Sequence, residues 1–261
     1  MKINDEGKRL IQEALNSQGK LSVRDVTELL NISEATARRL FVKLEEEGKV
    51  IRTFGGIQGL DADKNLYSFK DSSRQKMKEK LAIGRLAALE VESGDQIFLD
   101  SGTTVMAMAR VLASRMEAGE LNNVRVVTNS LIITDLLADR CKVILVGGEI
   151  RTERRDACGY LAEEFLKRLH MKKAFLGCDA LDFTSGLMTT DERTAHMNEI
   201  VMKNVSNIYV LADAGKLGEI SFVSYGTLDA VHTLIVDDGI KAEHRAVLDG
   251  KVSRLLVAAV D

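Results

Sequence analysis

Apolar positions along the chain follow two different periods. In residues 1–59 they recur every three or four positions, as at Leu10, Ile11, Ala14 and Leu15, which is the period of a helix buried on one face. From Gln96 onward, short continuous apolar runs alternate with amphipathic stretches. Such runs are typical of strands that are buried on both faces of a parallel sheet. The change of period predicts two domains.

The first region predicts a winged helix-turn-helix domain at 1–59. Ser22 and Ser33 each stand where a hydroxyl can cap a following helix. The segment "KVIRTFGGIQG" (49–59) predicts two short strands about a glycine-containing turn. Three helices followed by such a hairpin make the winged motif. The polar segment 60–80 is expected to be a linker that passes into a helix ending near Glu92.

The second region, 81–261, predicts a Rossmann-like parallel α/β sheet. Helical candidates such as 103–116 and 161–169 lie between most of the apolar runs, and this alternation covers both faces of a sheet. Ligands of such sheets bind at the carboxyl ends of the strands. The seven expected strands are 96–100, 124–128, 142–146, 173–177, 207–212, 232–237 and 254–259.

The composition narrows the class of protein. Of the 261 residues, 45% are hydrophobic and 29% are charged, which supplies enough apolar side chains for a hydrophobic core. The net charge of -3 excludes a polycation. The three cysteines form no CxxC pair and no cluster with histidine, so we expect reduced thiols, no metal and no cofactor. No apolar run approaches the ~18 residues of a membrane span, and the opening residues carry no apolar core of a signal peptide. We therefore expect a cytoplasmic protein.

The expected third helix carries its polar chemistry opposite the apolar stripe that includes Ala37, Phe41 and Leu44. Two adjacent arginines near a helix N-terminus can reach phosphates or the O6/N7 edge of guanine, and cations on the wing can reach flanking phosphates. An ordinary solvated face is the alternative. The predicted DNA contacts are Ser33, Thr36, Arg38, Arg39, Lys49 and Arg52.

The stretch "FLDSGTT" (98–104) ends an apolar run in hydroxyl residues around one glycine. Glycine permits close approach of the backbone, and the helix expected to follow presents its N-terminus to an anion. Simple helix caps are the alternative here and at the other strand ends. The predicted effector-binding residues are Asp100, Ser101, Gly102, Thr103, Thr104, Thr128, Asn129, Ser130, Gly147, Gly148, Asp179, Glu192 and Lys216, the last of which could instead be a solvated surface lysine.

The stretch "ISEATARRLFVKLEEEGKVIRTFGGIQ" (32–58) resembles the N-terminal signature of the DeoR family of bacterial transcription regulators. The segments "IFLDSGTT", "VVTNSL", "LVGGEIR", "KAFLGCDALD", "GLMTTDE", "VLADAGKLG" and "LIVDDG" are similar to that family's effector domain, in order. Three departures stand out. Leu40 replaces the usual acid, Met188 stands where threonine is common, and "ADAGK" (212–216) replaces the more usual "ADSSK".

The resemblance implies a repressor of sugar-catabolism genes that senses a phosphorylated sugar or polyol, with a sensor fold similar to sugar-phosphate isomerases and CoA transferases. Its implied partners are operator DNA, the effector and further copies of the chain, as dimer or tetramer. Activation in place of repression remains open. A sugar-phosphate isomerase-like or deaminase-like enzyme is the alternative, because Asp179, Asp182, Asp213, Glu192 or His196 could supply a base. A fold confers no reaction by itself, so we expect no catalysis.

Overall fold

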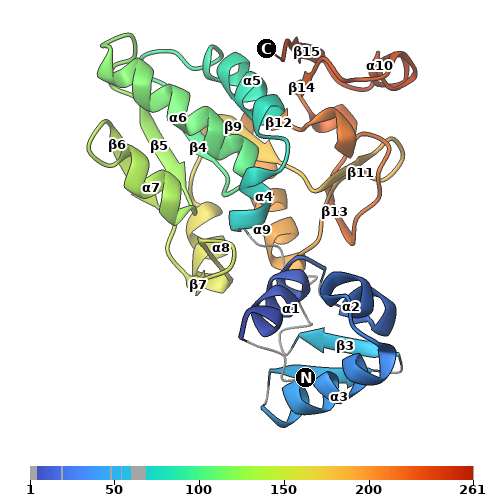
Figure 1. The fold of residues 1–261 in the computed structure, drawn as a ribbon. Coiled ribbons are helices and arrows are strands. Elements are labelled where there is room, and N and C mark those ends of the chain that lie inside the picture. The colour runs from blue at the N-terminus through green and yellow to red at the C-terminus, as the bar shows by residue number, and fades with distance from the viewer. Residues whose placement is uncertain (1–4, 19, 48, 54, 60–68, 261) are drawn as a thin grey trace. The chain divides into compact units, whose positions relative to one another are not determined.

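The computed structural model describes residues 5–18, 20–47, 49–53, 55–59 and 69–260. The chain forms two compact units, Met1–Tyr67 and Ser68–Asp261. Figure 1 labels their helices and strands in chain order.

The first unit is the expected winged helix-turn-helix. Its helices are α1 (Asp5–Gln18), α2 (Val23–Leu30) and α3 (Glu34–Glu46), and its strands are β1 (Lys20–Ser22), β2 (Val50–Thr53) and β3 (Gly56–Gly59). The strands pair antiparallel in the order β1-β3-β2. Strand β1 was not expected, because three residues between two helices are too few to show an alternating pattern.

Local side-chain bonds begin two of these helices where the sequence predicts. The Ser22 hydroxyl accepts the backbone N–H of Asp25 at 3.1 Å, and the Asp25 carboxylate accepts the N–H of Ser22 at 2.8 Å, which is a capping box. Ser33 caps α3 by accepting the N–H of Thr36 at 3.3 Å. Gly48, expected to end α3, lies outside the described residues.

The second unit is built on a seven-stranded sheet in which every neighbouring pair is parallel. All seven apolar runs of the sequence form its strands. They are β4 (Gln96–Leu99), β5 (Arg125–Thr128), β6 (Lys142–Leu145), β9 (Met171–Gly177), β12 (Val205–Leu211), β14 (Thr233–Asp237) and β15 (Arg254–Ala258).

The strand order is β15-β14-β12-β9-β4-β5-β6. The chain therefore runs outward from β4 through β5 to β6, returns to the other side of β4 as β9, and runs outward again. The carboxyl ends of β4 and β9 flank the point where the winding reverses, which is where ligands bind in sheets of this kind.

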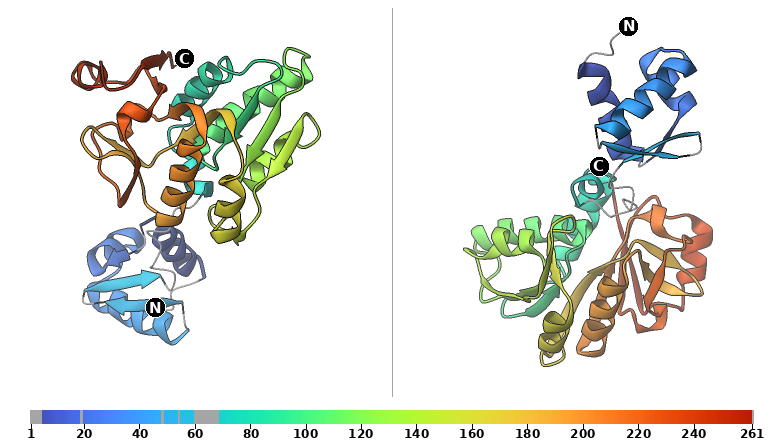
Figure 2. Two further views of the ribbon diagram at one scale, coloured as in Figure 1. Left: turned by 180° about the vertical axis from the view of Figure 1, so that it is seen from behind. Right: turned by 90° about the horizontal axis from the view of Figure 1, so that it is seen from below.

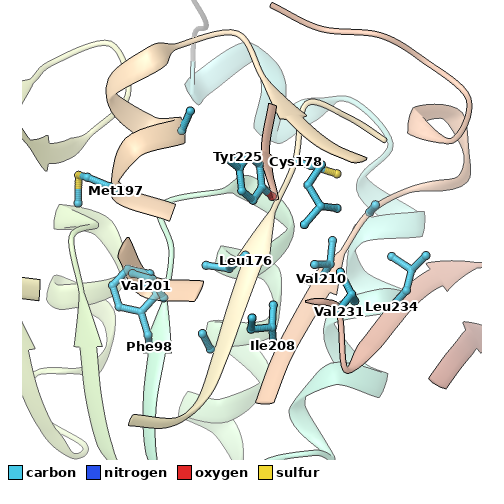
Figure 3. Packing of buried hydrophobic residues seen from close by; sticks show 14 of the residues in the cluster. Phe98, Leu176, Cys178, Met197, Val201, Ile208, Val210, Tyr225, Val231 and Leu234 are labelled. Carbon is cyan, nitrogen blue, oxygen red and sulfur yellow. The ribbon is translucent and has the colours of Figure 1, made fainter. Parts of the chain in front are cut away.

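Helices cover both faces of this sheet (Figures 1 and 2). One face carries α5 (Met77–Ala88), α6 (Thr103–Glu117) and α7 (Leu131–Leu137), and the other carries α8 (Tyr160–Leu166) and α9 (Glu192–Lys203). Figure 3 shows part of the core, where Phe98, Leu176 and Ile208 of three neighbouring strands lie beside Val201 of α9.

Helices α5 and α6 approach each other closely at Gly84. A Cβ at this position would lie 2.7 Å from the backbone nitrogen of Met108. The absence of a side chain at Gly84 thus lets α5 pack directly against the backbone of α6 at Met108.

Residues 69–80, which the sequence analysis assigned to a linker and the start of a helix, belong to the second unit. They form the short helix α4 (Phe69–Arg74) and the first turn of α5. The helix expected to reach Glu92 ends at Ala88. The polar sequence concealed these helices, because among the residues of this segment whose burial is described (69 and 72–80) only Phe69 and Lys80 are buried.

The remaining elements decorate the sheet. Strands β7 (Glu149–Arg151) and β8 (Asp156–Cys158) form a hairpin, while β10 (Ala180–Asp182), β11 (Gly186–Thr189) and β13 (Val223–Gly226) form a small antiparallel sheet. The other helices are the short turns η1 (Ala214–Lys216) and η2 (Leu228–Ala230) and α10 (Ala242–Leu248).

Candidate functional site

Asp100 ties together the two strand ends at the reversal of winding. It is 7% exposed and follows β4 directly. Its carboxylate accepts the backbone N–H of Gly102 at 2.6 Å and that of Gly177, at the end of β9, at 2.7 Å. Burial raises the pKa of Asp100 to about 6, against the opposing effect of these two bonds and of Lys216. The predicted ligand Asp100 therefore shapes the loop.

The N-terminus of α6 lies in this loop. Gly102 is the residue that precedes the helix, and a Cβ there would lie 2.8 Å from the carboxylate oxygen of Asp100. Thr103 and Thr104 occupy the first turn and are 5% and 2% exposed. The first turn of a helix leaves backbone N–H groups without partners in the helix and carries a positive partial charge. Binding of an anion at this turn stays a prediction.

Three lysines gather around Asp213, which follows β12. The Lys216 ammonium donates to the backbone carbonyl of Cys178 and lies 4.0 Å from the Asp213 carboxylate. The Lys76 ammonium lies 3.8 Å from the same carboxylate. Lys80 is 5% exposed, and its ammonium donates to the carbonyl of Ser72 at 2.6 Å. Burial and the nearby Lys216 cation lower the pKa of Lys80 to about 8.

Lys76 and Lys80 were not predicted from the sequence. Both precede the first strand of the sheet, where no strand-end motif draws attention to them. One signal was available: Lys80 shares a face with Ile83 and Ala87 on α5, and all three are buried. A lysine on the apolar face of a helix is seldom buried without a partner.

A buried charge network supports the other side of the loop. The Ser101 hydroxyl donates to Asp156 at 2.7 Å. Arg151 binds both carboxylate oxygens of Asp156, at 2.8 and 2.7 Å, and also donates to Asp191 at 2.6 Å. The side chains of Arg151 and Asp156 are 2% and 0% exposed. Ser101 is thus oriented by a hairpin that the sequence analysis did not connect with it.

Residues 128–130, at the end of β5, make capping hydrogen bonds and also carry one acceptor atom without a partner among the described residues. Thr128 accepts the backbone N–H of Ser130 at 3.1 Å, and Ser130 caps α7 by accepting the N–H of Ile133 at 3.3 Å. The amide nitrogen of Asn129 donates to Ala157 at 3.1 Å. The Oδ1 atom of Asn129 is buried and has no hydrogen-bond partner in the described part of the chain.

The other residues predicted to bind the effector lie in different surroundings. Gly148 packs against the hairpin, since a Cβ there would lie 2.3 Å from the carbonyl oxygen of Cys158, whereas Gly147 has open space. One carboxylate oxygen of Asp179 accepts the hydroxyls of Thr189 and Thr190, each at 2.9 Å. Glu192 is exposed at the start of α9.

Two of the residues considered as an enzymatic base, Asp182 and His196, make contacts with other neighbours. Asp182 accepts the backbone N–H groups of Thr184 and Ser185 in a turn. His196 is about half exposed and lies 3.1 Å from Glu163. Among the described residues, no group of three or more His, Cys, Asp and Glu side chains is placed to hold a metal ion.

The first unit presents its arginines on the outer side of α3. Arg38 is 62% exposed and lies 3.7 Å from Glu34. Arg39 donates to the backbone carbonyl of Ala35 at 3.3 Å. A cavity of about 210 Å³ separates α3 from the wing and is lined by Val23, Arg38, Arg39, Phe41, Val42, Arg52, Gly55 and Gly56. Arg38 and Arg39 of the predicted recognition helix and Arg52 of the wing therefore line one surface.

The remaining predicted contacts lie around this surface. Arg52 lies 3.4 Å from Glu45, and Lys49 lies 2.8 Å from Glu47. The hydroxyls of Ser33 and Thr36 lie 2.9 Å apart at the start of α3. Both wing cations are paired with exposed acids, and such pairs hold a side chain only weakly.

Comparison with known proteins decides the family. Residues 8–62 match the DeoR-like helix-turn-helix domain and residues 75–238 match the DeoR C-terminal sensor domain. The chain belongs to the DeoR family. It is 31% identical to the HTH-type transcriptional regulator GlpR of Haloferax volcanii, over 94% of both chains. It is also 31% identical to the HTH-type transcriptional repressor GlcR of Bacillus subtilis, over 96% of this chain and 95% of the relative.

A solved structure of ribose 5-phosphate isomerase A from Methanocaldococcus jannaschii is 22% identical over 52% of each chain, with a TM-score of 0.40. The similar curated proteins named above are regulators or repressors and not enzymes. The family assignment therefore favours a DNA-binding transcription regulator over the isomerase-like alternative. None of the described helices has the length and apolar content needed to cross a bilayer.

Two departures from the DeoR pattern have structural accounts. Leu40, in place of the usual acid, is 5% exposed and packs in the core of the first unit. Gly215 stands where the family more often has serine, and a Cβ there would lie 3.0 Å from the Lys76 ammonium. The side chain of Lys76 thus reaches the space beside position 215.

Proposed function

We propose that this DeoR-family protein is a repressor whose affinity for operator DNA changes when a phosphorylated sugar binds its second unit. The observation that carries the proposal is the convergence of the α6 N-terminus with the ammonium groups of Lys80 and Lys216 at the reversal of winding. This combination favours a dianion over a neutral sugar, because hydrogen bonds between ions are stronger than those between neutral groups.

The phosphate would be held at the first turn of α6. The hydroxyls of Thr103 and Thr104 and the free N–H groups of that turn supply short-range donors. Lys216 and Lys80 supply positive charge from two other elements. Asp100 fixes the loop from beneath by holding Gly102 and Gly177.

The sugar or polyol would extend toward the open acceptors. The Oδ1 atom of Asn129 is buried without a partner, so a ligand hydroxyl would satisfy it. Thr189 and Thr190 donate their hydrogen bonds to the Oδ2 atom of Asp179, so its Oδ1 atom would accept a second hydroxyl of the ligand. A hydroxyl-bearing ligand that carries a phosphate fits both groups of side chains.

The first unit would hold operator DNA. Arg38 and Arg39 of α3 would enter the major groove, and Lys49 and Arg52 of the wing would contact flanking phosphates. One module of this size covers little DNA, so we infer at least a dimer acting on two half-sites. A strict monomer in light scattering, both free and on DNA, would exclude that inference.

Repression is inferred from relatives. GlcR is named a transcriptional repressor, and a relative from Escherichia coli O157:H7, 28% identical over 91% of this chain and 88% of the relative, is named a putative aga operon transcriptional repressor. A regulator of sugar genes that reads a phosphorylated sugar would act in the cytoplasm, where such metabolites are formed.

A thermal-shift screen tests the proposal. Sugar phosphates, the matching free sugars and inorganic phosphate are added to the full-length protein. A ligand at 100 times its dissociation constant stabilises the folded state by about 2.7 kcal/mol if it binds only that state. We expect stabilisation of the second unit by a sugar phosphate and none by its free sugar. Equal stabilisation by both would exclude the phosphate site, and steady turnover of the sugar phosphate would favour the enzyme.

A further inference from the structure

Helix α4 is the first described element after the DNA-binding unit, and it cannot be stable by itself. It spans only the six residues Phe69–Arg74. Isolated helices of fewer than about 12 residues are marginal in water. The position of α4 therefore depends on contacts with the rest of the second unit.

Polar contacts near both ends of α4 help to hold it in place. At its first residue, the N–H of Phe69 donates to the carbonyl of Glu153 at 3.0 Å, and the Phe69 side chain is buried. Near its end, the carbonyl of Ser72 accepts the Lys80 ammonium at 2.6 Å. The Ser72 hydroxyl lies 3.5 Å from the hydroxyl of Thr103. The contacts of Ser72 are thus made by two side chains of the proposed phosphate site.

A bound phosphate would compete for both of these side chains. A phosphate dianion is a stronger acceptor for an ammonium than a neutral carbonyl is. Either hydroxyl of the Ser72–Thr103 contact can be the donor. Thr103 has a single hydroxyl proton, so once it donates to a phosphate it can no longer donate to Ser72. The Lys216 cation also disfavours the charged form of Lys80 in the free protein, and an anion between the two lysines would relieve that repulsion.

We propose that Lys80 and Thr103 exchange Ser72 for the phosphate of the effector, and that this exchange releases the C-terminal end of α4. The inference rests on the proposed phosphate site. Helix α4 would then be the element through which the sensor acts on DNA binding, because residues 60–68 join it directly to the first unit. A ligand shifts an equilibrium between two states only by binding one of them better than the other. Here the two states differ in the acceptor of the Lys80 ammonium, which is the Ser72 carbonyl in one and the effector phosphate in the other.

Hydrogen–deuterium exchange on the full-length protein tests the release. Inorganic phosphate is the probe, with chloride at the same ionic strength as the control. We expect slower exchange over 101–108 and at least tenfold faster exchange over 69–74 when phosphate is saturating. Slower exchange over 101–108 with unchanged or slower exchange over 69–74 would overturn the release and leave the phosphate site intact. No change over 101–108 would overturn the phosphate site and the release together.

A variant pair separates the role of Lys80 from a general effect of charge. Lys80→Met removes the donor to Ser72 and keeps an apolar stem in the buried position. We expect fast exchange over 69–74 in this variant without phosphate, and no further increase with it. Lys142→Met is the matched control, because Lys142 begins β6 at the opposite end of the sheet. Wild-type exchange over 69–74 in Lys80→Met would overturn the proposal.

A milder variant tests the proposal if Lys80→Met does not fold. Ser72→Ala removes only the hydroxyl contact with Thr103, so we expect a smaller increase in exchange over 69–74. Ser114→Ala is its control, because Ser114 is exposed on α6 and its hydroxyl donates to the carbonyl of Arg110, one turn earlier in the same helix. Equal exchange over 69–74 in the two alanine variants would exclude the Thr103 contact as an anchor.

Discussion

The two units of this DeoR-family protein place their charges in opposite environments. In the DNA-binding unit, Arg38 and Arg52 are about half exposed or more and lie beside exposed acids at 3.7 and 3.4 Å. In the sensor unit, Arg151 and Asp156 are completely enclosed and joined by two short hydrogen bonds. Lys80 and Asp100 are buried as well.

This difference matches what each unit has to bind. Exposed ion pairs contribute little to stability, so the arginines can exchange a glutamate for a DNA phosphate at small cost. Buried pairs are expensive to break, so the sensor loop is held in one geometry before its ligand arrives. The comparison predicts that substitutions in the sensor network reduce stability or effector binding, whereas those on α3 reduce DNA binding alone.

The largest effect is expected from breaking the buried pair. Arg151→Met should lower the free energy of unfolding of the second unit by about 3–5 kcal/mol, because it leaves the Asp156 carboxylate buried without its partner. Urea unfolding of the full-length protein measures the change. Lys167→Met, which removes an exposed pair with Glu164 on α8, is the control and should leave the unfolding midpoint unchanged. Equal midpoints for the two variants would contradict the contrast between buried and exposed charges.

The next effect concerns the effector. Thr103→Ala or Lys216→Ala should weaken binding of a sugar phosphate roughly 10- to 150-fold, since hydrogen bonds to charged groups contribute about 1.5–3 kcal/mol each. Calorimetry with matched free and phosphorylated sugars gives the affinities. Lys142→Met again serves as control. Variants that keep full affinity for the sugar phosphate would show that the anion binds elsewhere.

On the recognition helix, Arg39→Ala should cost about 1–3 kcal/mol of operator affinity if Arg39 reads a guanine. The operator can be selected from random DNA by the purified protein, and fluorescence anisotropy then measures binding. A phosphate contact would instead weaken all sequences alike and lower the salt slope by about one unit. Arg24→Ala on α2 is the matched control, as Arg24 is exposed and paired with Glu28. Normal operator binding by both Arg38→Ala and Arg39→Ala would exclude α3 as the reading helix.

The smallest effect is a pH dependence of effector affinity. Burial and Lys216 lower the pKa of Lys80 to about 8, so the free protein loses the Lys80 proton as pH rises through 8. The phosphate is already a dianion there, because its second pKa is about 6. Because the phosphate binds the protonated form of Lys80, the affinity for the effector should fall about tenfold between pH 7 and pH 9. Lys80→Arg, which stays charged, should flatten this fall, and an unchanged pH profile would contradict the role of Lys80.

The fold could be predicted because its signals are local. Seven apolar runs became the seven parallel strands, and the serines before α2 and α3 cap those helices through bonds that span three residues. The candidate site was predicted only where a motif follows a strand, as at Asp100 and Thr103. Lys80 and Arg151 were missed because no strand-end motif marks them. Some of the groups that act on them, Asp191 for Arg151 and Lys216 for Lys80, lie far away along the chain. The capping alternative holds for Ser130, whose hydroxyl is used by α7.

The central claim is that one ligand site controls another, and operator binding measured with and without effector tests it most directly. The selected operator is titrated with wild-type protein and with Lys216→Ala, each with and without saturating sugar phosphate. For the wild type we predict a change in operator affinity of about 5- to 150-fold, the usual range of such coupling. For Lys216→Ala at the same effector concentration we predict normal operator affinity and a loss of most of that change. A variant that loses operator binding but keeps the effector, or a wild type whose operator affinity is unchanged by a bound effector, would contradict the account.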